Sequence, residues 1–96
     1  MAKDVRLEEV GDELILWEDE RLVATVLDPL HARLYRMAVA GKSLDEIEQA
    51  ERTAFCVPPE REIKPILTMI LYELVDQGFV DEEPLRLGPR HPFTGE

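Results

Sequence analysis

The chain is short and strongly acidic: its 96 residues include 21 Asp and Glu against 11 Lys and Arg, a formal net charge of -10. A chain of this length forms one domain with a modest core, so a large active-site cavity is not expected. The negative field repels phosphate groups, which makes nucleic acid a disfavoured partner. With one cysteine, no signal-peptide pattern and no apolar run of about 20 residues, the sequence indicates a soluble cytoplasmic protein that does not cross a membrane.

The first part of the chain has the pattern of three antiparallel strands. Residues 5–10 alternate apolar and charged side chains, Gly11-Asp12 supplies a tight turn, and residues 13–17 resume as the second strand. After a charged turn, residues 22–27 (LVATVL) are apolar or β-branched throughout, which is typical of a strand partly covered on both faces. We expect Trp17 to anchor the core or its edge.

Apolar residues at helical spacing predict three helices over about residues 29–40, 43–55 and 61–77. Asp28-Pro29 has the composition of a helix start, because aspartate accepts hydrogen bonds from free N–H groups and proline suits the first helical position. Gly41 is placed to end the first helix in a left-handed conformation. A capping box follows, in which Ser43 caps the second helix and Glu46 reaches back to it.

The third helix begins close to Pro65, which is tolerated only in the first turn. Gly78-Phe79 predicts its end, with Phe79 touching Leu74 in a Schellman arrangement. The acidic residues of the second helix are expected to form a solvated face: Asp45, Glu46, Glu48 and Glu51. From Asp81 on, three prolines and two glycines without periodicity predict a flexible tail over residues 81–96, after a domain of residues 1–80.

The sequence lacks the residue patterns that catalysis requires. His31 and His91 lie far apart in the sequence, and no zinc motif or glycine-rich phosphate loop is present. We expect His31 to be an exposed polar residue, and Cys56 to be a small buried hydrophobe because no basic residue lies next to it in the sequence. No enzymatic activity, cofactor or metal is therefore predicted.

The order of three strands and three helices, the junction AGKSLDEI and the ending ILTMILYELVDQGFV resemble the PqqD-like family, the RiPP recognition elements. The resemblance covers about residues 5–80. Its motifs are a glycine followed by Ser/Thr-x-x-x-Ile, and an L-x-x-x-G-hydrophobic ending; the residues that match are Gly41, Ser43, Ile47, Leu74, Gly78 and Phe79. The fold that it implies is α+β and winged-helix-like, a three-stranded antiparallel sheet followed by three helices.

The resemblance also implies a function without catalysis. Such domains bind the leader segment of a ribosomally synthesised precursor peptide by strand addition and present it to a modifying enzyme, such as a radical-SAM enzyme. The peptide would pair with the third strand beside a wall formed by the third helix. The implied binding residues are Leu22, Val23, Ala24, Thr25, Val26, Leu27, Lys64, Leu67, Leu71 and Leu74.

Three alternatives stay open at this point. Val23, Thr25 and Leu67 could instead be core or dimer contacts. A winged-helix DNA-binding regulator has similar elements, but its recognition helix should present polar and basic side chains, and the third helix here reads ILTMILYELV. A small dimeric adaptor is the third possibility, and the sequence does not distinguish a monomer from a homodimer.

Overall fold

A computed structural model describes residues 4–88 and confirms the predicted α+β fold of three antiparallel strands followed by three helices. The elements are β1 (Arg6–Val10), β2 (Glu13–Glu18), β3 (Val23–Leu27), α1 (Pro29–Val39), α2 (Leu44–Ala54), α3 (Lys64–Asp76) and a short 3-10 helix, η1 (Glu83–Leu85). Their ends lie within a few residues of the predicted ones. No helix within residues 4–88 combines the length and the apolar character that a membrane span requires.

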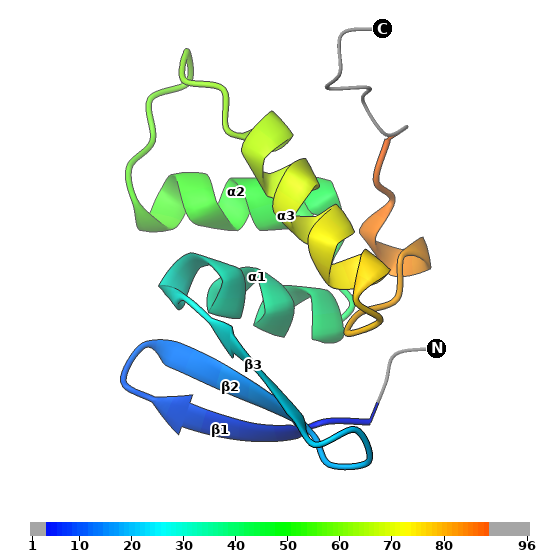
Figure 1. Ribbon diagram of the computed structural model, residues 1–96. Coiled ribbons are helices and arrows are strands. Elements are labelled where there is room, and N and C mark those ends of the chain that lie inside the picture. The colour runs from blue at the N-terminus through cyan, green and yellow to red at the C-terminus, as the bar shows by residue number, and fades with distance from the viewer. Residues whose placement is uncertain (1–3, 89–96) are drawn as a thin grey trace, which may run out of the picture.

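The elements form layers, with α1 in the middle. Figure 1 shows the sheet on one side of α1 and both α2 and α3 on the other, and α1 contacts β2, β3, α2 and α3. Leu14, Leu16 and Leu27 lie on the sheet face that α1 covers, and all three are buried. The core therefore lies on both sides of α1, and the sheet contributes one face to it.

The opposite face of the sheet is open among the described residues. In the antiparallel register Ile15 pairs with Val26 and Trp17 pairs with Ala24, so these four side chains point away from α1. Trp17 was expected in the core or at its edge; it is half-buried on this face and is not part of the buried core. Its ring lies 5.3 Å from the guanidinium carbon of Arg6, and its Nε1 donates a hydrogen bond to Glu8 at 3.0 Å.

The predicted helix ends are confirmed. Asp28 accepts a hydrogen bond from the backbone N–H of His31 at 2.8 Å, and Pro29 occupies the first helical position. The capping box of Ser43 and Glu46 has both of its hydrogen bonds. At the end of α3 the N–H of Phe79 donates to the carbonyl of Leu74 at 3.0 Å, as the Schellman motif requires.

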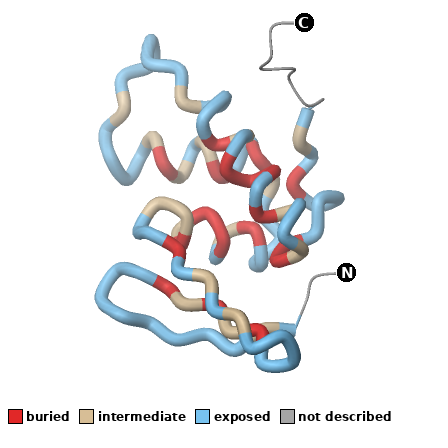
Figure 2. Tube along the Cα trace, viewed as in Figure 1, coloured by how far each residue is buried: buried red, intermediate tan, exposed pale blue. Residues whose placement is uncertain are grey.

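The segment after α3 differs from the predicted tail over residues 81–88. Leu85 has 0% of its surface exposed and belongs to the core, while Leu87 packs against it. The Tyr72 hydroxyl donates a hydrogen bond to the Gly88 carbonyl. Figure 2 shows a buried stretch in this segment. Leu85, Leu87 and the Tyr72 hydrogen bond therefore hold this segment to the domain. Residues 89–96 lie outside the described chain.

Two expectations about α2 and its end are wrong. Glu51 is buried rather than solvated, because the Arg33 guanidinium of α1 pairs with both of its carboxylate oxygens at 3.1 Å. The side chain of Cys56 is exposed rather than buried. Cys56 follows the end of α2 with a φ of 51°, and this left-handed turn directs the chain away from the helix.

The Asp28 cap gives a first testable prediction. Its carboxyl has a lowered pKa, chiefly because it accepts the hydrogen bond from the backbone N–H of His31. The charged cap therefore stabilises the fold at neutral pH, and this contribution is lost as the pH falls through the lowered pKa. We expect Asp28→Ala to cost about 1 kcal/mol of unfolding free energy at neutral pH and much less in acid. Urea unfolding at both pH values measures this, and a cost independent of pH would contradict it.

Candidate functional site

The two edges of the sheet differ in charge. The strand order is β1-β2-β3, so β1 and β3 are each paired on one side only among the described residues. β1 carries Arg6, Glu8 and Glu9 in its five residues, whereas β3 (VATVL) carries no charged residue. Charged side chains are a common device that prevents an edge strand from pairing with another chain. The edge of β3 lacks this protection, which makes it the stronger candidate for a binding surface.

The predicted strand residues are exposed to different degrees along this edge. Leu22, just before β3, is 91% exposed, and Val26 is 59% exposed on the open face of the sheet. Val23 and Thr25 are half-buried and Ala24 is exposed, whereas Leu27 is buried in the core. Five of the six predicted strand residues are therefore at least partly accessible, and Leu27 contributes only its backbone.

The predicted helix residues are placed differently. Leu67, Leu71 and Leu74 are buried in the core, so none of the three offers a surface to a ligand. Lys64 is exposed, but its Nζ lies 3.0 Å from Asp45 and 3.8 Å from Glu48 on α2. Its hydrogen bond with Asp45 raises the pKa of the Lys64 ammonium. The wall implied for the third helix is therefore not formed by these four side chains.

A chain of polar contacts nevertheless joins the end of β3 to α3. Nδ1 of His31 lies 2.9 Å from the Asp28 carboxylate, and its Nε2 lies 3.3 Å from the Glu73 carboxylate. Asp28 directly follows β3, and Glu73 lies on the outer side of α3. Sequence reasoning missed this link, because nothing local indicates that His31 and Glu73 meet. Ile66 lies on the same side of α3 as Glu73, two turns earlier, and is half exposed.

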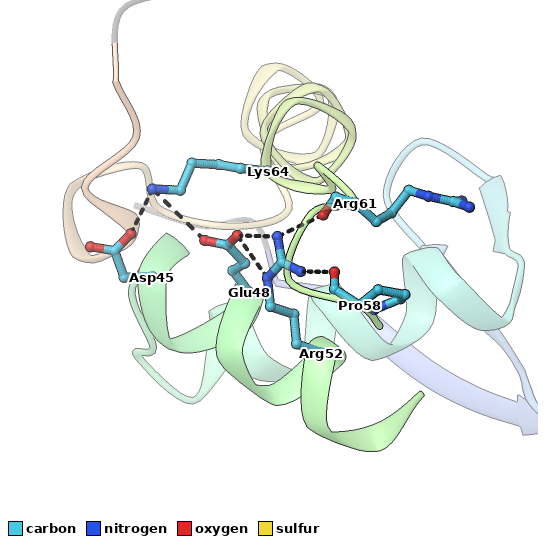
Figure 3. Close-up of polar contacts among 6 residues, drawn as sticks. All are labelled: Asp45, Glu48, Arg52, Pro58, Arg61 and Lys64. Carbon is cyan, nitrogen blue, oxygen red and sulfur yellow. Dashed lines mark hydrogen bonds and ion pairs between the residues drawn. The ribbon is translucent and has the colours of Figure 1, made fainter. Parts of the chain in front are cut away.

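A hollow lies between α2, α3 and the segment after η1, with a volume of about 790 Å³. Glu48, which lines this hollow, pairs with two other lining residues, Arg52 at 3.1 Å and Lys64 at 3.8 Å. Figure 3 shows Arg52 donating to the backbone carbonyls of Pro58 and Arg61 and pairing with Glu48. These contacts hold the linker between α2 and α3 against α2. We therefore assign this hollow a structural role.

The structure offers no evident metal centre in the part of the chain that it describes. Within residues 4–88, no three side chains of His, Cys, Asp or Glu are grouped so that they could hold a metal ion.

Comparison of the chain with protein-family models, with curated proteins and with solved structures finds no match.

Proposed function

We propose that the protein is a non-catalytic recognition domain that binds an extended peptide as a fourth, antiparallel strand on the edge of β3. The peptide that the resemblance to PqqD-like domains suggests is the leader segment of a ribosomally synthesised precursor. The domain would then present it to a modifying enzyme, such as a radical-SAM enzyme. The observation that carries the proposal is that β3 is an uncharged edge strand, whereas β1, at the opposite edge of the sheet, carries charged residues.

Strand addition fits the chemistry of this edge. The backbone hydrogen bonds of the added strand supply affinity, and alternate side chains of the peptide supply selectivity. Side chains on the inner face would lie next to Val23 and Thr25, near α1. Side chains on the outer face would lie next to Val26, on the open face that also holds Ile15. The suitable partner therefore has apolar or β-branched residues on both faces of its strand.

The resemblance implies that the third helix lies beside β3, but in this chain the helix beside β3 is α1. It packs against β2 and β3, whereas α3 packs against α1 and α2. The part of α3 left for contact with a peptide is the side that carries Glu73, which reaches the start of α1 through His31. The proposed site therefore consists of the β3 edge, the first turn of α1 and the Glu73 side of α3.

The same edge suits a second copy of the chain, which is the alternative of a small dimeric adaptor. Two β3 strands could pair antiparallel, since neither carries a charge that would oppose pairing. This alternative differs from peptide binding in one measurable way. It predicts a dimer without any added peptide, whose formation depends on protein concentration.

An NMR titration tests the proposal. Peptides selected on the domain from a random display library are the probe, and sedimentation gives the oligomeric state. We expect a monomer in which bound peptide protects amides of residues 23–27 on alternate positions, because every second N–H of an edge strand faces outward. Shifts confined to α2 that spare β3 would contradict the site. A dimer with the same protection pattern before any peptide is added would favour the adaptor.

A further inference from the structure

The two ends of β3 differ in their electrostatic surroundings. Leu27 pairs with Leu14, so the turn before β2 and the start of α1 meet at the Leu27 end of the strand. Four acidic residues lie at this end: Asp28 and Glu73 flank His31, and Asp12 and Glu13 directly precede Leu14, the partner of Leu27. Within residues 4–88 no lysine or arginine forms an ion pair with any of the four. Glu9, opposite Leu14 on β1, is paired with Arg36 at 2.8 Å. The Leu27 end is therefore negative, because the four other carboxylates have no lysine or arginine partner among the described residues.

His31 offsets this charge only in part. Its ring lies between Asp28 and Glu73, whose side chains are each 59% exposed. An uncharged imidazole carries a single N–H, so it can donate to only one of the two carboxylates. A protonated ring would carry one positive charge, which is less than the combined charge of the two carboxylates. A cationic side chain from a partner would be favourable at this position.

At the opposite end of β3, arginine side chains neutralise part of the negative charge. Glu18, which pairs with Val23, accepts a hydrogen bond from Arg21 at 3.0 Å. Asp19 pairs with Arg6 at 3.0 Å, and Arg6 lies on β1 opposite Trp17. Asp4 and Glu20 also lie at this end, so it stays acidic, but less so than the Leu27 end. The electrostatic potential therefore becomes more negative along β3 from Val23 to Leu27.

We infer that this charge gradient sets the chemistry of the N-terminal flank of the bound peptide. The inference rests on the proposed function. An antiparallel strand places its N-terminal residues next to Leu27 and its C-terminal residues next to Val23. The partner is therefore an extended segment with Lys or Arg immediately before an apolar, β-branched core. Asp28 and Glu73 bind this cationic flank, and the same attraction speeds association at low salt.

A peptide display library tests the inference. Each peptide has a fixed Val-Thr-Val-Thr-Val core with random residues on both sides, and peptides are selected for binding to the domain. On the wild-type domain we expect Lys and Arg to be enriched on the N-terminal side of the core and not on the C-terminal side. Asp28→Asn keeps a capping oxygen and Glu73→Gln keeps a hydrogen-bonding group, so both variants remove charge with little change in shape. Each should weaken a selected peptide about two- to fivefold, in line with exposed ion pairs. Glu60→Gln, in the exposed linker between α2 and α3, removes the same charge and should change nothing.

A nitroxide on the N-terminus of a selected peptide gives the direction of binding. We expect it to broaden amides around Asp28 and His31 more strongly than the amide of Val23, at the other end of β3. Peptides that protect β3 but show no basic bias, or a label that broadens Val23 instead, would overturn the inference and leave strand addition intact. A library that yields no peptide protecting β3 would overturn the proposed function itself.

Discussion

Replacement of Leu85 by alanine is expected to lower the free energy of unfolding by about 2–5 kcal/mol, the usual cost of a buried Leu→Ala change. Leu85 is fully buried in the same core cluster as Leu34 and Leu71, so the shorter side chain leaves a cavity that rigid neighbours fill only partly. Urea denaturation followed by circular dichroism measures the change. Truncation after Val80 should cost at least as much, because it removes Leu87 as well.

Leu22→Ala is the matched control for this prediction. It makes the same chemical change at a leucine that is 91% exposed, so the unfolding free energy should stay within about 0.5 kcal/mol of the wild type. If Leu85→Ala is as mild as Leu22→Ala, the segment after α3 is not part of the folded core in solution. That result would restore the simpler expectation of a loose chain from Asp81 onward.

The contrast between these two leucines shows why part of the fold could be predicted from sequence and part could not. Strand alternation, helix caps and the glycines after the first and third helices are local signals, and each of them predicted an element that the structure contains. The burial of Leu85 depends on where the chain turns after Gly78, and a lone leucine has no periodicity to reveal its position. Local patterns therefore predicted the elements but not the last residue that packs on them.

The candidate site shows the same division. The sequence identified residues 22–27 as an apolar strand, and the order of the strands then places it at an edge. Hydrophobic spacing on α3 correctly marked Leu67, Leu71 and Leu74 as one face, but that face is turned to the core. Helical spacing alone does not say which partner an apolar face meets. Glu51 was misjudged for the same reason, because its pairing with Arg33 joins two helices.

Proline substitution in β3 is expected to separate the two sides of the strand. Backbone N–H groups alternate between β2 and the outer edge, so Thr25→Pro and Val26→Pro remove one of each kind. The variant that loses the inward N–H should be destabilised, because it breaks the ladder with β2. The variant that loses the outward N–H should stay folded and lose peptide binding. Thermal unfolding and titration with a selected peptide measure the two properties separately.

The matched control is the same pair of changes on the other edge, Glu8→Pro and Glu9→Pro in β1. One of these also keeps its ladder hydrogen bonds, and that folded variant should bind the peptide as the wild type does, because β1 lies on the far side of β2 from β3. Peptide binding that survives both β3 substitutions, or that is lost in the folded β1 variant, would rule out the outer backbone of β3 as the docking edge. If only the folded β3 variant loses binding, the peptide is recognised through the backbone N–H groups of β3. A side-chain site elsewhere would not distinguish the two edges of the sheet.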